Sequence, residues 1–135
     1  MKIRLRHVNK SDYKFLFRIL SERNPNSNIS HRKMPSYKEH LAFIRSKPYP
    51  YWYVIEIGRS KIGSIYLTTD NEIGIHLKKN FCQTRTLQDI FNILKLLQPR
   101  NRYYVNISPK NTKLTNFFKN NGFTLRQVTY AIDYT

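Results

Sequence analysis

Three short strand-forming segments follow one another between residues 51 and 77, joined by connections too short to hold anything but tight turns. The segments are 51–57, 61–68 and 72–77, and the turns are Gly58-Arg59-Ser60 and Thr69-Asp70-Asn71. Connections this short join strands that lie side by side and antiparallel. The middle of the chain is therefore predicted to form an antiparallel sheet, around which the remaining elements must pack.

The third segment alternates between apolar and polar side chains. Ile73, Ile75 and Leu77 point to one face, and Glu72, Gly74 and His76 to the other. A glycine inside a strand predicts either a bulge or a close backbone approach at Gly74. The apolar face is expected to meet the core, and the polar face to remain available for chemistry.

The flanking segments complete an α+β pattern. Strands are predicted at 2–7, 102–107, 123–126 and 128–132. Helices are predicted after a cap at Asn9 or Ser11 and up to Asn24-Pro25-Asn26, and at about 37–46, 85–98 and 112–121. Ser36 and Glu39 are spaced as a capping box for the second helix. We expect residues 1–135 to form one α+β domain, with a mixed, mostly antiparallel sheet flanked by helices.

Composition limits the classes of function. The chain has 24 Lys and Arg against 8 Asp and Glu, a formal charge of +16, which favours phosphate-bearing partners. Its content of Asn, Ile, Tyr, Phe and Lys is also that of an AT-rich coding sequence, which raises Lys without functional selection. One cysteine and four scattered histidines exclude an internal disulfide and give no metal-site pattern. The absence of an apolar signal or spanning segment predicts a soluble, cytoplasmic protein without membrane contact.

The segment 102–123, RYYVNISPKNTKLTNFFKNNGF, resembles the GCN5-related N-acetyltransferases. Asn111, Phe118, Gly122 and Phe123 match the family's N-P-x-N…(Y/F)-x-x-x-G-F ending, and Ser108 replaces its first Asn. Residues 71–77 are similar to the family's fourth strand. The helix that begins at about Arg85 is similar to the family's helix that receives the cofactor pyrophosphate. The resemblance implies the family's fold, acetyl-coenzyme A as co-substrate, no metal, and transfer of an acetyl group to a primary amine.

The resemblance also implies which residues bind the cofactor. These are Ile75, Leu77, Lys78, Lys79, Gln83, Thr84, Arg85, Thr86 and Asn111. The family's phosphate loop, (Q/R)-x-x-G-x-(G/A), is occupied by residues 82–87, where Arg85 and Leu87 replace the small residues. Either Thr hydroxyls and the Arg85 guanidinium replace backbone donors, or this is an ordinary helix start capped by Thr86. Asn111 either contacts the cofactor or caps its own helix.

Two residues on the polar face of segment 72–77 are candidates for catalysis. Glu72 would accept the proton of the attacking amine, and His76 has a suitable titration range. The alternatives are that Glu72 only balances the charge of nearby lysines and that His76 is only packed. Phe118 stands where many members carry a proton-donating Tyr, so Tyr103, Tyr104 or water would protonate the leaving thiolate. Cys82 has no paired base that would make it a nucleophile.

His31, Trp52 and Tyr53 are the candidate acceptor-binding residues, because aromatic and basic groups together suit a phosphate-bearing ring. The same residues would equally fit a solvated loop and a core. The expected partner is a small, anionic amine such as a nucleotide-linked amino sugar; a homodimer is compatible, and nucleic acid is not expected. The rival functions are a degenerate, non-catalytic module of the same fold and a basic nucleic-acid-binding protein, which lacks recognisable nucleic-acid motifs.

Overall fold

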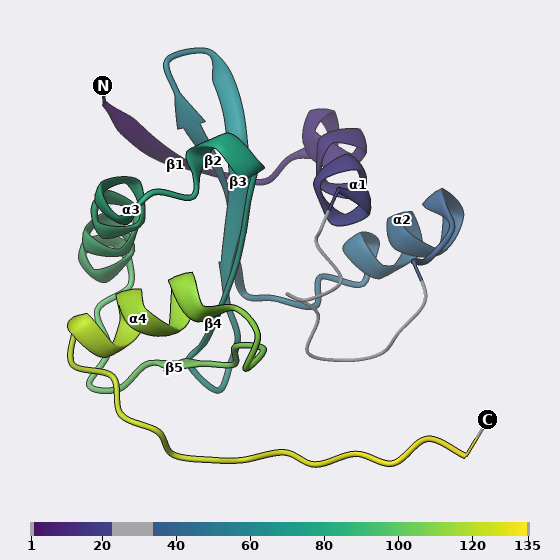
Figure 1. Ribbon diagram of the computed structural model, residues 1–135. Coiled ribbons are helices and arrows are strands. Elements are labelled where there is room, and N and C mark those ends of the chain that lie inside the picture. The colour runs from purple at the N-terminus through teal and green to yellow at the C-terminus, as the bar shows by residue number, and fades with distance from the viewer. Residues whose placement is uncertain (1, 23–33, 135) are drawn as a thin grey trace.

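Five strands form one sheet in the order β1-β2-β3-β4-β5 in the computed structural model, which describes residues 2–22 and 34–134 (Figure 1). The strands are β1 (Ile3–His7), β2 (Tyr51–Ile57), β3 (Ser60–Leu67), β4 (Glu72–Leu77) and β5 (Tyr104–Val105). β1 to β4 are antiparallel neighbours, while β5 runs parallel to β4. The predicted antiparallel centre and the mixed α+β class are confirmed.

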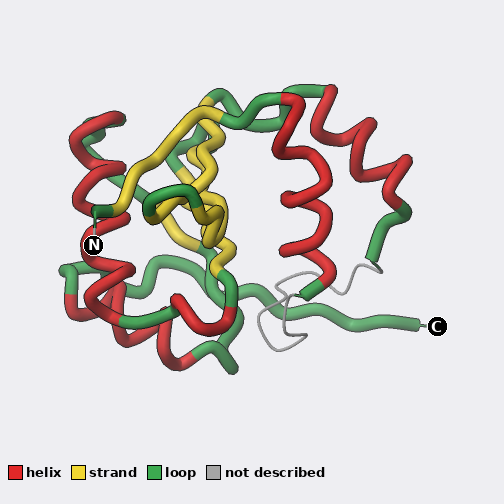
Figure 2. Tube along the Cα trace, turned by 90° about the horizontal axis from the view of Figure 1, so that it is seen from above, coloured by secondary structure: helices red, strands yellow, loops and turns green. Residues whose placement is uncertain are grey.

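Helices cover both faces of the sheet (Figure 2). The helices α1 (Tyr13–Ser21) and α2 (Tyr37–Arg45) lie on one face, with a short 3-10 turn, η1 (Lys10–Asp12), ahead of α1. The helices α3 (Thr84–Leu97) and α4 (Thr112–Asn120) lie on the other face, with η3 (Lys79–Phe81) before α3. The capping box of Ser36 and Glu39 is present at the start of α2, as predicted. None of the described helices has the length and apolar character to cross a membrane.

Strand alternation divides the core in two. The larger cluster lies between the sheet and α3 and α4, and includes Ile55, Leu67, Leu87 and Leu94. The smaller cluster lies beneath α1 and α2, and includes Phe15, Leu16, Ile19, Ile44 and Val54. Because Val54 and Ile55 are adjacent in β2, their burial in different clusters shows that both faces of this strand are covered.

Gly74 permits a close approach and makes no bulge. The β3–β4 register runs without a shift from Gly63↔Leu77 to Leu67↔Ile73, and a Cβ at Gly74 would overlap the ring of Tyr66. That ring stacks on Tyr49 with centroids 3.6 Å apart. The bulge is therefore wrong, and the group that approaches Gly74 is a side chain and not the predicted backbone. The sheet's irregularity lies instead between Ile55 and Glu56 in β2.

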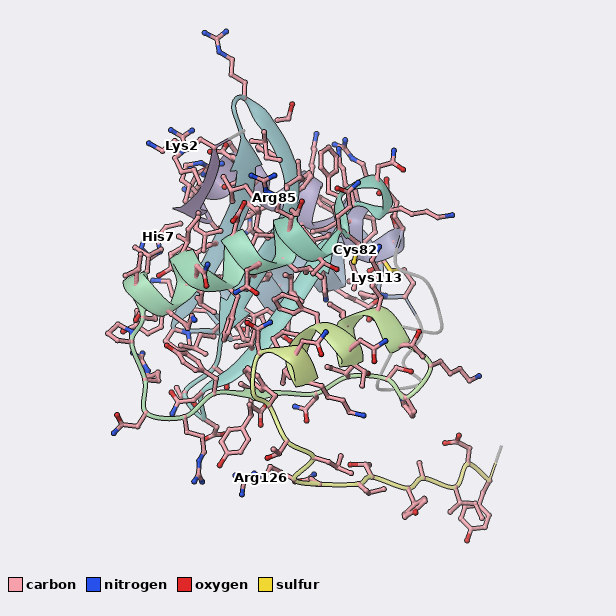
Figure 3. The ribbon with its side chains drawn as sticks, turned by 60° about the vertical axis from the view of Figure 1, so that its left-hand side comes forward. Lys2, His7, Cys82, Arg85, Lys113 and Arg126 are labelled. Atoms are coloured by element: carbon pink, nitrogen blue, oxygen red, sulfur yellow. The ribbon has the colours of Figure 1, made fainter. Side chains whose placement is uncertain are left out.

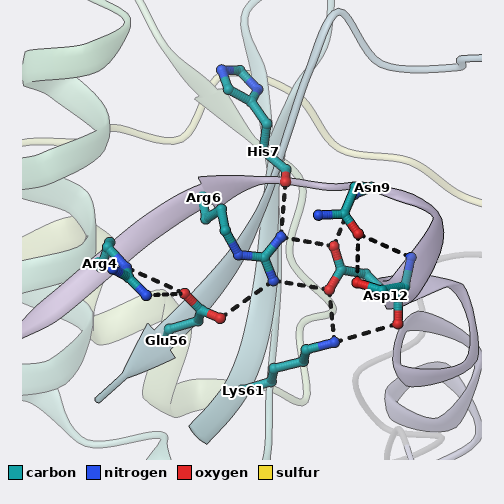
Figure 4. Close-up of polar contacts among 8 residues, drawn as sticks. Arg4, Arg6, His7, Asn9, Asp12, Glu56 and Lys61 are labelled. Carbon is teal, nitrogen blue, oxygen red and sulfur yellow. Dashed lines mark hydrogen bonds and ion pairs between the residues drawn. The ribbon is translucent and has the colours of Figure 1, made fainter. Parts of the chain in front are cut away.

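A partly buried ionic network joins β1, β2, β3 and η1 (Figure 4). Asp12 is fully buried and accepts hydrogen bonds from Arg6 at 2.9 and 3.0 Å, with the Lys61 ammonium at 2.7 Å. Arg6 also bonds Glu56, which Arg4 holds from the other side at 2.8 Å. Burial alone would raise the pKa of Asp12, but the bonds from Arg6 and Lys61 outweigh it and lower that pKa to about 2.

The C-terminal region departs from the prediction. β5 covers only Tyr104–Val105 instead of 102–107, and the strands predicted at 123–126 and 128–132 are absent. After Gly122 the chain is extended, with no ladder partner among the described residues, and Tyr130 is 92% exposed. Strand-forming residues define a strand only where another strand supplies hydrogen bonds, and this segment lacks one.

Candidate active site

β4 and β5 pair over a short distance and then separate. The ladder joins Glu72 to Tyr104 and Ile73 to Val105, and goes no further. The carbonyl of Glu72 accepts a hydrogen bond from the β3 side at 3.0 Å, and the N–H of Lys78 donates one to β3 at 2.8 Å. The even-numbered residues of β4 therefore direct their backbone groups to β3. The N–H and C=O groups of Ile75 and Leu77 therefore face the β5 side, beyond the point where β5 pairs. An extended ligand could add to this free backbone edge.

The start of α3 lies just beyond β4. The helix begins at Thr84, and its N-cap, Gln83, makes no side-chain capping bond. The prediction of a start capped by Thr86 is therefore wrong, because Thr86 is already helical. The backbone N–H groups of the first turn, at Thr84, Arg85 and Thr86, point out of a 14-residue helix whose dipole favours an anion there.

Arg85 and Leu87 replace the small residues of the family's phosphate loop, and they affect the start of α3 differently. Leu87 is only 1% exposed and packs in the larger core cluster, so its side chain leaves the helix start uncovered. Arg85 is exposed on α3, and Thr84 beside it is also exposed (Figure 3). Leu87 therefore accounts for the hydrophobic packing of this turn, and Arg85 for its charge.

At the start of α4 the structure settles the role of the predicted Asn111 and adds Lys113, which the sequence did not single out. Asn111 caps α4, with its Oδ1 accepting from the N–H of Leu114 at 3.2 Å, so the capping alternative is confirmed. Lys113, in the first turn of α4, lies beside Cys82 (Figure 3). Its position in that turn was visible in the sequence, but its approach to residue 82 depends on how α3 and α4 pack.

Burial raises the pKa of Cys82, and the charge of Lys113 only partly offsets that effect. The thiol is therefore protonated at neutral pH. A protonated, half-buried thiol is a poor nucleophile, in agreement with the absence of a paired base in the sequence.

Glu72 lies where β4 and β5 begin to diverge. Asn106 donates from its side-chain amide to Glu72 Oε2 at 3.4 Å, and Tyr104 is the register partner of Glu72. Paired residues of neighbouring strands share a face, so Tyr104 and Glu72 both lie on the side of α1 and α2. The structure thus brings a carboxylate, an amide and a phenol to the opening of the sheet.

His76 shares this face but lies farther along β4, opposite the buried Ser64 of β3. Four residues of strand separate the Cα atoms of Glu72 and His76 by about 13 Å. The two predicted catalytic residues therefore do not converge on one atom. Each would serve a different position of the acceptor amine.

The candidate proton donors lie in different surroundings. Tyr103 packs in the core cluster of α3 and α4, and its hydroxyl donates to the carbonyl of Gln98 at 2.6 Å. Phe118 is 4% exposed, with its ring edge-on to Phe91 and Phe123. Tyr104 is the predicted tyrosine that lies beside Glu72.

The predicted acceptor residues are separated. Trp52 lies beside Tyr66 and Tyr49 on the α1 and α2 side, and its buried Nε1 has no hydrogen-bond partner among the described residues. Tyr53 lies on the opposite face, 2% exposed, with its hydroxyl accepting from Gln98 at 2.9 Å. Pairing Tyr53 with Trp52 was wrong because adjacent strand residues point to opposite faces. His31 lies outside the described residues.

A basic depression of about 430 Å³ opens next to α1. Lys14, Arg18, Lys61 and Lys78 line it, and the Lys78 ammonium lies 5.7 Å from the centre of the Phe15 ring. Lys78 was predicted to contact phosphate at the start of α3, but its side chain is on the face of α1. Lys79 is exposed at the start of η3.

No profile of a known protein family matches the sequence, and no curated protein matches it. Solved structures do match in fold. A domain from Methanocaldococcus jannaschii has 19% identity and a TM-score of 0.72, with 91% of this chain and 88% of that one covered. An acetyltransferase from Thermus thermophilus has 14% identity and a TM-score of 0.71, with coverages of 92% and 88%.

A third match is the spermidine N-acetyltransferase of Vibrio cholerae in complex with coenzyme A and spermine. Its identity is 17% and its TM-score 0.72, and the alignment covers 93% of this chain and 82% of that one. These alignments extend over nearly the whole chain. The chain has the fold of the GCN5-related N-acetyltransferases.

Proposed function

We propose that this protein is an acetyl-coenzyme A-dependent N-acetyltransferase acting on a small, anionic primary amine. The observation that carries the proposal is the free backbone edge of β4 at Ile75 and Leu77, which leads to the uncapped start of α3. The backbone edge of β4 suits the amide-containing arm of coenzyme A, and the start of α3 suits its pyrophosphate. The fold shared with structures that bind coenzyme A supports this arrangement.

The phosphates would be held by backbone N–H groups of the first turn of α3, with charge from Arg85 and Lys113. Thr84 and Thr86 add hydroxyl donors at the same turn. This replaces the close backbone approach of a glycine loop by charge-assisted side-chain contacts. Lys79 and Gln83 lie at the entrance, where they would contact the same groups.

The reaction would be a direct attack. Glu72 takes a proton from the acceptor ammonium, and the amine nitrogen forms a bond with the thioester carbonyl carbon. A backbone N–H at the free β4 edge stabilises the resulting oxyanion. The carbon–sulfur bond then breaks, and the leaving thiolate takes a proton from Tyr104 or from water. The nitrogen gives its second proton to the tyrosinate or hydroxide left behind, which yields the neutral amide. His76 is the alternative base for an amine that enters nearer Leu77.

Three features favour an anionic acceptor. The depression lined by Lys14, Arg18, Lys61 and Lys78 lies on the same face of the sheet as Glu72. The buried indole N–H of Trp52 provides a donor without a partner in the described part of the chain. A chain of charge +16 would repel a polyamine such as the spermine bound by the Vibrio cholerae structure.

Calorimetric titration with acetyl-coenzyme A tests the cofactor proposal. We expect micromolar binding, weakened at least tenfold by Arg85→Glu and by Lys113→Glu. Arg59→Glu makes the same charge change in the turn between β2 and β3 and should leave the affinity unchanged. Equal affinities for all these variants, or no binding by the parent chain, would overturn the proposal.

A catalytically degenerate binding module is the second candidate, favoured by the altered phosphate loop and by Phe118 in place of a tyrosine. It predicts coenzyme A binding without acetyl transfer to any amine. A screen of phosphate-bearing and neutral amines for thiol release separates the two. The nucleic-acid alternative predicts instead an affinity for DNA or RNA that falls steeply with added salt.

A further inference from the structure

The outer edge of β1 is unpaired in the described part of the chain. β1 is the first strand in the sheet order and pairs with β2 alone among the described strands. Just after β1, the N–H of Val8 donates to the carbonyl of Trp52 at 3.0 Å, so the even-numbered residues of this segment bond β2. The N–H and C=O groups of Ile3 and Leu5 therefore face away from β2. An exposed edge of this kind offers donors and acceptors to another strand.

A groove of about 620 Å³ runs beside this edge, and we call it the β1–α3 groove. Its apolar walls are Ile3 and Leu5 from β1, and Ile93 and Leu97 from α3. Ile93 and Leu97 are four residues apart, so they lie on the same face of the helix. Figure 3 shows the two elements next to each other. The remaining lining residues are polar or charged: Lys2, Arg4, Asp89 and Asn92.

A strand edge beside a helix has the form of a site for an extended peptide. Such a peptide adds as a strand, with its backbone bonded to the edge and every second side chain in the groove. The groove has apolar surface to offer, because Leu97 is 45% exposed although it lines the groove. Burial of this surface by apolar side chains of the peptide would favour binding.

Charge along β1 restricts the occupant. The even-numbered side chains Lys2, Arg4 and Arg6 are all basic, and the side chain of Arg4 stays 65% exposed beside Glu56. β1 of a second copy would bring its own basic side chains next to these, and like charges in neighbouring strands destabilise the pairing. Acidic side chains at alternate positions of an added strand would instead form charge-assisted contacts with Lys2 and Arg4.

We propose that the β1–α3 groove binds an extended segment of a partner protein in which apolar residues alternate with acidic ones. The segment adds to β1 as a further strand. Its apolar side chains meet Ile93 and Leu97, and its acidic side chains lie beside Lys2 and Arg4. β1 and β5 stand at opposite ends of the strand order, so a bound partner leaves the candidate active site between β4 and β5 open. The groove thus tethers the protein to a partner and does not depend on the proposed acetyl transfer.

Fluorescence anisotropy with a labelled heptapeptide that alternates Val and Glu tests the groove. We expect micromolar binding at physiological salt, weakened at least tenfold by Leu97→Gln, which places a polar amide in the groove. The matched control is Leu96→Gln, because Leu96 is 83% exposed and does not line the groove. No binding by the parent chain, or equal affinities for the two variants, would rule out the β1–α3 groove as the site.

Two altered peptides test charge and strand addition separately. A peptide with Lys in place of Glu should fail to bind, because its charge repels Lys2 and Arg4. A peptide with Pro in place of the central Val lacks one backbone N–H and should bind at least tenfold more weakly. Unchanged affinity for the proline peptide would show that charge attraction alone holds the probe, which contradicts strand addition.

Amide hydrogen exchange locates the bound peptide. Saturation with the Val–Glu peptide should slow exchange at Ile3 and Leu5 at least tenfold, and leave Arg4 and Arg6, whose amides bond β2, unchanged. Protection confined to the basic depression next to α1 would place the peptide there and overturn the proposal. Sedimentation velocity on the chain without peptide covers the remaining occupant. Self-association that Leu97→Gln abolishes would show a second copy in the groove instead of a partner protein.

Discussion

The two halves of the sheet are built for different purposes. Between β1, β2 and β3 the ladder runs along the full strands, and Asp12, Arg6 and Glu56 lock the strands to α1. Between β4 and β5 the ladder has two pairs, and beyond it no strand among the described residues pairs with the backbone of Ile75 and Leu77 on the β5 side. Where its strands meet, one half satisfies its backbone groups internally and is stable. The other half leaves the backbone groups where we propose that the cofactor binds, and the first half would supply the stability that this requires.

The largest expected effect lies in the closed half. Asp12→Ala leaves Arg6 and Lys61 without their buried partner, and we expect the free energy of unfolding to fall by about 3 kcal/mol. Urea denaturation measures it. Glu72→Gln, in the open half, should change that free energy by no more than about 0.5 kcal/mol. Similar losses for both variants would remove the distinction between the halves.

The same carboxylate sets the acid stability. Because the folded protein holds the pKa of Asp12 at about 2, below its usual 3.8, the stabilisation is complete above the unfolded pKa and is lost as pH falls from about 5 towards 2. We expect Asp12 to contribute about 2 kcal/mol to this loss. The free energies of unfolding of the parent and of Asp12→Asn should converge as pH falls through this range. A constant difference between them would contradict this role of Asp12 in acid stability.

Gly74 tests the face shared by β3 and β4. A methyl group there would overlap the Tyr66 ring, so Gly74→Ala should destabilise the protein by about 1–3 kcal/mol. In a Tyr66→Leu background the same change should cost less than half as much, because the flexible leucine can move. An equal cost in both backgrounds would show that Tyr66 is not the obstacle.

Glu72→Gln is expected to act on turnover and hardly on stability. Removal of a general base lowers the rate by about 10²–10⁴-fold, while affinity for acetyl-coenzyme A should stay within about twofold. Steady-state rates and calorimetry on the same preparation measure both. If His76→Gln shows the rate loss and Glu72→Gln does not, the acceptor amine enters nearer Leu77.

The closed half was largely predictable from the sequence. β2 has the predicted ends, since alternation and tight turns are local properties. The turn at Gly58-Arg59-Ser60 and the cap at Ser36 were predictable for the same reason, because their signals are also local. The network around Asp12 was not predictable, because Lys61 reaches Asp12, and Glu56 reaches Arg6, only through the pairing of strands that are distant in the sequence.

The open half was predicted less well. The strands expected at 123–126 and 128–132 have the right alternation, but alternation cannot reveal whether a neighbouring strand is present. The closed half holds one error as well: Tyr53 was assigned to the acceptor side from its position beside Trp52, and the alternation of β2 puts it in the core instead. Lys113 was missed because its place beside Cys82 depends on the packing of two helices.

Amide hydrogen exchange of β4 tests the central claim most directly. In the free protein, the amides of Ile75 and Leu77 should exchange fast, while those of Gly74 and His76, bonded to β3, exchange slowly. Acetyl-coenzyme A should slow Ile75 and Leu77 by at least tenfold and leave Gly74 and His76 unchanged. Slow exchange at all four positions without ligand, or no change at Ile75 and Leu77 on saturation, would contradict a cofactor bound along the free edge of β4.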